Sequence, residues 1–135
     1  MKCNKQQLIM EHYSNPKFLN NSLDEEKDFT IYSEHCVDKI TFGLQSQDNK
    51  ISICHKTVGC AVCVASTDML IGLINNHDKK TILELVNKYQ KLINQEIKED
   101  DDLKELNIFC DVKVHLNRFN CANLIAKGLI QLLEQ

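Results

Sequence analysis

From Phe29 the apolar residues repeat every two positions, and from Gly59 they follow a helical repeat. Apolar side chains alternate over residues 29–33, 40–44 and 51–53, with a turn-like sequence at 47–50. This alternation predicts three half-buried strands joined as an antiparallel meander. Strands first and helices afterwards predict an α+β fold, in which helices pack on one face of a three-stranded antiparallel sheet.

Helix signals occur on both sides of the predicted sheet. Asn4 is a suitable N-cap for a helix over residues 5–14, which Pro16 ends because its ring disfavours helical geometry in the preceding residue. Thr81 and Glu84 form a capping box that predicts the start of another helix. We expect the first helix to bury Leu8, Ile9 and Tyr13, and the central helix to run from Cys60 to about Asn75. The helix after the capping box should bury the stripe Ile82, Val86, Tyr89 and Ile93, and a solvated acidic loop should follow at 99–102. The last helix should begin at Phe119 or Asn120 and carry Leu124, Ile125, Leu129 and Leu132.

Composition restricts the class of protein. The chain has 135 residues, 43% of them hydrophobic and 26% charged, as in ordinary globular domains. No linker or repeat divides it, so residues 1–135 are expected to form a single domain. The net charge of −3 and the absence of a basic stripe argue against a nucleic-acid partner. Neither a signal peptide nor a long apolar segment is visible, which predicts a cytoplasmic protein that does not enter the membrane.

Seven cysteines are the unusual feature of the composition. In a reducing compartment, clustered cysteines more often indicate metal binding or catalysis than disulfides. Cys36 follows the first predicted strand, whereas Cys60 and Cys121 lie in the predicted first turns of helices, where the helix dipole favours a thiolate. With Asp38, the three cysteines complete a tetrahedral ligand set for Zn²⁺. Taken singly, each of these cysteines is more often a buried apolar residue than a metal ligand.

Four sequence blocks resemble the U-type iron–sulfur assembly proteins, the family of IscU, SufU and NifU N-terminal domains. Residues 9–16 read I-M-E-H-Y-S-N-P, which is similar to the D-H-Y-x-N-P signature of the opening helix. Residues 36–38 read C-V-D where the family has C-G-D. Residues 59–66 read G-C-A-V-C-V-A-S, close to G-C-A-x-S-x-A-S. Residues 121–124, C-A-N-L, match the third cysteine motif, so the resemblance covers nearly the whole chain.

Two details are closer to the SufU branch than to the IscU branch. The segment between Cys60 and Cys121 is long, as in SufU-like proteins that carry an insertion there. Residues 118–121 read R-F-N-C, which resembles the R-x-x-C of SufU, and Asn120 stands where IscU-type proteins have histidine. Val37 departs from the family glycine, so the Cys36 loop is expected to be stiffer or differently arranged.

The resemblance implies a zinc-dependent sulfur acceptor that takes persulfide sulfur from a SufS-like cysteine desulfurase for iron–sulfur cluster assembly. It implies that Cys36, Asp38, Cys60 and Cys121 hold Zn²⁺. Cys36 would accept the sulfur, and Arg118 would stabilise the anionic site. Such a protein transfers sulfur from the desulfurase to downstream assembly or acceptor proteins.

Alternatives stay open from the sequence. Cys36, Cys60 and Cys121 would also suit a transient [2Fe–2S] cluster, which makes a cluster scaffold the second hypothesis. Cys60 and Cys63 form a C-x-x-C motif that could serve thiol–disulfide exchange, and a zinc site could simply hold the fold together.

The other cysteines and the histidines have no predicted part in the chemistry of the site, apart from His35 as a spare ligand. We expect Cys54 in a strand, Cys63 and Cys110 in the core, and Cys3 exposed. We expect His12 to be structural, and we predict no role for His55, His77 or His115.

Overall fold

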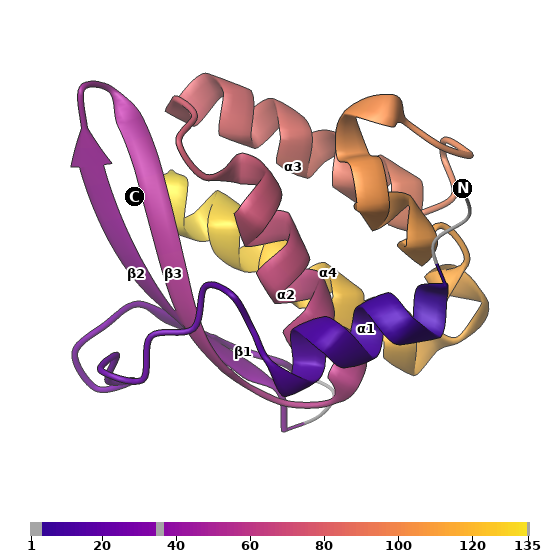
Figure 1. Ribbon diagram of the computed structural model, residues 1–135, viewed down its shortest axis with the longest axis horizontal. Helices are drawn as coiled ribbons and strands as arrows, with labels where there is room; N and C mark the ends of the chain where they lie inside the picture. Colours follow the sequence, from indigo (N-terminus) through magenta and orange to yellow (C-terminus); the bar gives the residue numbers. More distant parts are fainter. Residues whose placement is uncertain (1–3, 35–36, 135) are drawn as a thin grey trace.

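The computed structural model describes residues 4–34 and 37–134. Helices and a small sheet form two layers, and both kinds of element are labelled in Figure 1. The strands are β1 (Thr30–Tyr32), β2 (Lys39–Gln47) and β3 (Lys50–Val58), the α-helices are α1 (Lys5–Ser14), α2 (Ala61–Ile74), α3 (Lys79–Ile93) and α4 (Leu116–Leu133), and the 3₁₀ helices are η1 (Asp101–Phe109) and η2 (Val112–Val114).

The sheet has the predicted antiparallel order β1-β2-β3. In β2 and β3, Lys39 pairs with Val58 at one end and Gln47 with Lys50 at the other, so the two strands form one continuous hairpin. Asp48 and Asn49 make its two-residue turn with φ of 53° and 66°, left-handed values that favour the right-handed twist of a hairpin. The predicted meander is therefore confirmed.

The helices cover one face of this sheet, as predicted, and α2 runs through the middle of the helical layer (Figure 1). The approach of α4 to the sheet is close: a Cβ added at Gly128 would lie 2.7 Å from Cζ of Phe42. Only glycine therefore allows α4 to lie directly on the sheet at this point. The chain has the α+β architecture that the change of periodicity predicts.

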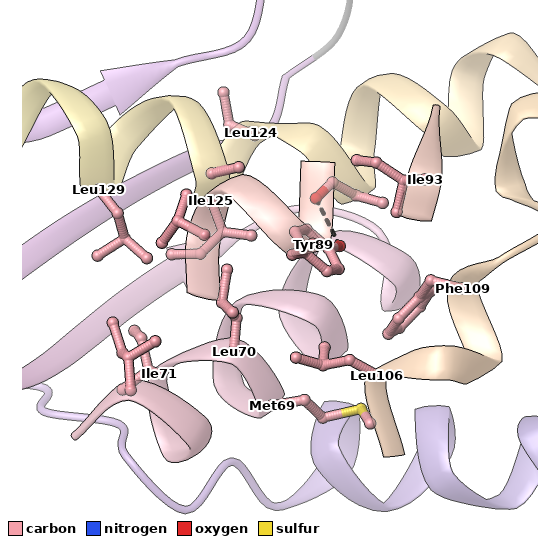
Figure 2. Packing of buried hydrophobic residues seen from close by; sticks show 14 of the residues in the cluster. Met69, Leu70, Ile71, Tyr89, Ile93, Leu106, Phe109, Leu124, Ile125 and Leu129 are labelled. Carbon is pink, nitrogen blue, oxygen red and sulfur yellow. Dashed lines mark hydrogen bonds between the residues drawn. The ribbon is translucent and has the colours of Figure 1, made fainter. Parts of the chain in front are cut away.

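The core lies between α2, α3 and α4, and it is closed at one end by η1. Tyr89, Leu70 and Ile125 are fully buried, and Figure 2 shows their side chains directed towards one another. The Tyr89 hydroxyl donates a hydrogen bond to the Ala122 carbonyl oxygen at 2.8 Å, so this buried phenol is satisfied. The predicted stripe Ile82, Val86, Tyr89 and Ile93 is entirely buried.

Three local expectations need correction. Helix α3 begins at Lys79, because the Asp78 carboxylate accepts the N–H of Thr81 and caps the helix before the predicted capping box. Helix α4 begins at Leu116, three or four residues earlier than predicted, with no side-chain cap. On α1, Ile9 is buried but Tyr13 is 43% exposed, so the predicted apolar face is narrower.

Other boundaries agree with the sequence. Helix α1 covers Lys5–Ser14, and the Asn4 side chain accepts a hydrogen bond from the Gln7 N–H. The acidic run is exposed at Glu99, Asp101 and Asp102 as expected, but it is not all loop: Asp100 caps η1, which begins at Asp101. Across the described ranges 4–34 and 37–134, every helix is too short or too polar to cross a lipid bilayer.

Candidate metal centre

Three predicted ligands from distant segments meet where the sheet joins the helices. Asp38 precedes β2, Cys60 precedes α2, and Cys121 lies on α4. One carboxylate oxygen and the two sulfurs lie within 4.8 Å of one another. The Sγ atoms of Cys60 and Cys121 are 3.1 Å apart. Tetrahedral zinc holds two sulfurs about 3.8 Å apart, so small side-chain rotations would open the cluster to the metal.

The corner between β3 and α2 places Cys60. Cys60 is the N-cap of α2. Its backbone is extended (φ −72°, ψ 168°), so Cys60 itself lies just outside the helix. Its N–H donates to Oδ1 of Asp38 at 3.2 Å. A Cβ on Gly59 would lie 2.4 Å from that same oxygen, so glycine is what allows the Asp38 carboxylate to lie against this corner.

Cys121 is held by packing rather than by a helix terminus. It is the sixth residue of α4 and therefore lies in the second turn, not in the predicted first turn. The prediction was wrong because α4 begins at Leu116, three or four residues before the predicted start at Phe119 or Asn120. The bond from Tyr89 to the Ala122 carbonyl ties this part of α4 to α3. Cys121 is 7% exposed, whereas Cys60 is exposed.

The electrostatics of the cluster are unfavourable without a cation. Asp38 is 3% exposed, and among the described residues its Oδ2 has no hydrogen-bond partner. Burial raises the pKa of the Cys121 thiol, and the neighbouring Asp38 and Cys60 raise it further. An unpaired buried carboxylate costs free energy, and a divalent cation would supply the missing partner and lower the thiol pKa.

The donor set therefore suits Zn²⁺. Two sulfurs and one carboxylate oxygen are the ligand types that zinc prefers, and three protein ligands leave one coordination position for a fourth group. The sequence predicts that Cys36 is this fourth ligand. Cys36, like the spare ligand His35, lies outside the described residues.

A statistical model of the NifU-like N-terminal domain matches residues 4–129 of the chain. The chain belongs to this family. It is 26% identical over 128 residues to the iron–sulfur cluster assembly scaffold protein IscU of Thermotoga maritima, covering 91% of this chain and 88% of that protein. It is also 35% identical over 105 residues to an uncharacterised protein of Borreliella burgdorferi, covering 76% of this chain and 72% of the relative.

Solved structures share the fold of this NifU-like domain. FiSufU from Fervidobacterium islandicum AW-1, named as a proposed iron–sulfur cluster assembly scaffold for the SUF system, superposes with a TM-score of 0.83 at 25% identity and 94% coverage of both chains. The N-terminal region of a NifU-like protein from Brucella abortus gives a TM-score of 0.72 at 15% identity, covering 95% of this chain and 92% of that one. The predicted fold family is thereby confirmed.

Among the described residues, Arg118 forms no hydrogen bond or ion pair with Asp38, Cys60 or Cys121. It is exposed on α4 and forms no ion pair with another residue in the described part of the chain. Its charge acts instead near Asp111, whose pKa is lowered mainly by the ammonium group of Lys5 and more weakly by Arg118. A role at the metal site stays a prediction for this residue.

The remaining cysteines of this NifU-like domain are placed much as expected. Cys63 is completely buried on α2, so the two sulfurs of the C-x-x-C motif lie in different environments. Cys54 is a partly buried residue of β3, and Cys110 packs partly buried against the core. Cys3 lies outside the described residues. The thiol that lies against Cys60 belongs to Cys121, which favours a metal site over thiol–disulfide exchange at the C-x-x-C motif.

The sequence interpretation missed a second buried carboxylate, Asp68. Its oxygens accept hydrogen bonds from His12 Nδ1 (2.7 Å) and His55 Nε2 (3.0 Å). The backbone N–H groups of Lys17 and Phe18 each donate to it at 2.9 Å. His12 is structural as expected, but His55 is buried and bonded where no role was predicted. The available signal was that Asp68 is the only charged residue in α2.

Proposed function

We propose that the chain is a zinc-dependent sulfur acceptor in iron–sulfur cluster assembly. The observation that carries the proposal is the meeting of Asp38, Cys60 and Cys121 within 4.8 Å, with one carboxylate oxygen left without a described partner. A structural carboxylate in the same protein, Asp68, has both oxygens satisfied by donors. The difference supports a ligand role for Asp38.

The residues divide between holding the metal and accepting sulfur. Asp38, Cys60 and Cys121 lie on or beside regular elements, which suits permanent ligands. Cys36 is proposed as the fourth ligand and as the acceptor. Bound zinc would keep the coordinating thiols deprotonated at neutral pH and protect them from oxidation. Because carboxylate is a harder ligand than thiolate, Asp38 makes the site more exchangeable than four cysteines would.

The proposed reaction is a sulfur transfer without net oxidation. A SufS-like cysteine desulfurase presents a persulfide on its own cysteine. The Cys36 thiolate attacks the outer sulfur, a new S–S bond forms at Cys36, and the S–S bond of the desulfurase breaks. The desulfurase cysteine leaves as a thiolate, which is the balanced course of thiol–disulfide exchange. Arg118, three residues before Cys121, is proposed to stabilise the negative charge during this exchange.

A cluster scaffold is the second candidate. The names of two relatives, IscU of Thermotoga maritima and FiSufU, favour it, since both are named as iron–sulfur cluster assembly scaffolds. The same thiolates would hold a nascent [2Fe–2S] cluster as cargo. The two candidates differ in which species occupies the ligands during turnover.

The deciding experiment measures metal content and desulfurase activity together. We expect about one zinc per chain after aerobic purification, and faster alanine production from cysteine by a SufS-like desulfurase when the protein is added. Cys36→Ser should abolish this stimulation and the persulfide detected on the chain by mass spectrometry. Absence of zinc, with visible absorbance from a bound cluster after iron and sulfide are supplied, would overturn the relay in favour of the scaffold.

Two variants serve as controls. Cys63→Ser changes a buried cysteine three residues from Cys60 and should leave zinc content unchanged; a loss of zinc there would favour the C-x-x-C alternative. Cys36→Ser should unfold at a urea concentration close to that of the wild type. If this variant is strongly destabilised while stimulation in the folded fraction persists, zinc holds the fold and does not serve sulfur transfer.

A further inference from the structure

A cavity of about 300 Å³ lies between α1, α2 and η1, apart from the metal cluster. His12 of α1, Asp68 and Met69 of α2, and Lys104 of η1 contribute to its wall. Asp68 is eight residues beyond Cys60, about 12 Å along the helix. Figure 1 shows η1 and α1 on the same side of α2. The cavity is therefore separate from the proposed sulfur-transfer site.

The Asp68 carboxylate fixes the orientation of His12. Four hydrogen bonds hold Asp68, and they keep its pKa low, at about 2, against the opposing effect of burial. Because this carboxylate carries no proton, the hydrogen of the 2.7 Å contact belongs to His12 Nδ1. In the neutral imidazole, Nε2 then carries a lone pair, and it has no hydrogen-bond partner among the described residues. When its imidazole is neutral, His12 therefore has a hydrogen-bond acceptor of fixed orientation, and it is one of the residues of the cavity wall.

Two lysines contribute to the same cavity wall as His12. Lys17 and Lys104 line the cavity, and neither forms an ion pair with an acid in ranges 4–34 and 37–134. Lys104 has φ of 51° and ψ of −123°, a backbone conformation that is costly for a residue other than glycine. The wall also holds two acids, Asp68 and Glu105, so its formal charge is balanced when His12 is neutral. Asp68 is surrounded by its own donors, which leaves the two lysines without an ion-pair partner among the described residues and available to an anion.

The rest of the wall is apolar. Phe18, Met69 and Leu73 contribute to it, and Figure 2 shows the Met69 side chain between the core and α1, next to Leu106. An apolar surface beside a few polar groups of fixed direction is the usual composition of a small-molecule site. The volume of about 300 Å³ suits a ligand of roughly ten to fifteen non-hydrogen atoms.

We propose that this cavity binds a small hydroxy acid with an apolar body. Its carboxylate lies between the ammonium groups of Lys17 and Lys104, and its hydroxyl donates to Nε2 of His12. Its apolar part packs on Phe18, Met69 and Leu73. The inference stands on the cavity and its hydrogen bonds alone, and does not depend on the sulfur-acceptor function.

Three probes of similar size test the proposal on the intact chain at pH 8. Mandelate carries the ring, carboxylate and hydroxyl, phenylacetate lacks the hydroxyl, and benzyl alcohol lacks the carboxylate. By NMR titration we expect mandelate to bind about fivefold more tightly than either, since each lost polar contact removes about 1 kcal/mol. Shifted amide signals should include those of residues 12, 17, 69 and 104. Equal affinities, or shifts confined to other surfaces, would overturn the proposal.

Variants separate the two polar contacts. His12→Gln should bring the affinities for mandelate and phenylacetate together, whereas the wild type distinguishes them. Lys104→Gly, which also relieves the left-handed backbone, should weaken mandelate about fivefold and leave benzyl alcohol unchanged. Lys127→Gln, an exposed lysine of α4 outside the cavity wall, is the matched control. If His12→Gln does not fold, Lys104→Gly decides alone: unchanged mandelate affinity there contradicts the site.

Discussion

Two buried carboxylates in this protein have opposite surroundings. Asp68, fully buried, receives hydrogen bonds from two imidazoles and two backbone N–H groups. Asp38, 3% exposed, accepts one from the Cys60 N–H, and its other oxygen has no partner in the described part of the chain. Burial of a charge is tolerated when donors replace water. A satisfied carboxylate therefore stabilises the fold, whereas an unsatisfied one beside two thiols indicates a cation site.

The largest expected effect is on stability, and it concerns Asp68, the carboxylate that is satisfied by donors. Asp68→Asn replaces one acceptor oxygen with a donor facing other donors, and it should lower the free energy of unfolding by about 3 kcal/mol. Urea denaturation of the metal-free protein measures the change. Asp101→Asn, at an exposed acid of η1, is the control and should stay within about 0.5 kcal/mol of the wild type. Similar stabilities for the two variants would show that the Asp68 network contributes little.

For Asp38, the proposed metal ligand, we predict a large effect on zinc affinity and a small effect on stability. Asp38→Asn should lower zinc affinity about 100-fold, because it removes one anionic ligand from the cluster. In the metal-free protein it should change the free energy of unfolding by less than about 1 kcal/mol, since the change affects one hydrogen bond of the described residues, the one from the Cys60 N–H. Competition with a chromogenic chelator measures the affinity. Unchanged zinc binding in this variant would remove Asp38 from the site.

The pH dependence of stability sharpens the contrast. The four donors to Asp68 hold its pKa at about 2, below its ordinary 3.8, although burial alone would raise it. Because the folded state lowers this pKa, the stabilisation is complete above about pH 4 and is lost as the pH falls towards 2. The loss amounts to about 2 kcal/mol. Urea denaturation of the metal-free protein between pH 2 and 6 should show the decline in the wild type. If Asp68→Asn declines by the same amount over this range, Asp68 is not its source.

The smallest effect concerns the corner that positions Asp38. Gly59→Ala places a Cβ 2.4 Å from the Asp38 Oδ1 position, so the carboxylate must move. We expect zinc affinity to fall about tenfold, or about 1.4 kcal/mol. Gly72→Ala, whose Cβ would meet the Phe18 ring and not a ligand, should keep wild-type affinity. Equal affinities in the two variants would mean that the corner tolerates a side chain.

The sequence alone determined the order of elements, and it singled out the residues that meet in the Asp38–Cys60–Cys121 cluster. Period-two alternation and helical spacing report which side chains face the core, so the meander and the buried stripe of α3 were predictable. The ends of the helices were less predictable. The local sequence contains two suitable caps for α3, Asp78 and Thr81, and the structure uses Asp78. Cys60 and Asp38 could be named from motifs that resemble a known family.

Only the tertiary structure decided which polar groups are satisfied. Sequence spacing cannot show that Cys60 and Cys121 lie 3.1 Å apart, because β3, α2 and α4 come together only through packing of the core. The C-V-D motif set Asp38 apart in the sequence, but the sequence could not show that Asp68 is buried among donors. Hydrogen bonds from distant segments surround Asp68, whereas one oxygen of Asp38 has no partner among the described residues.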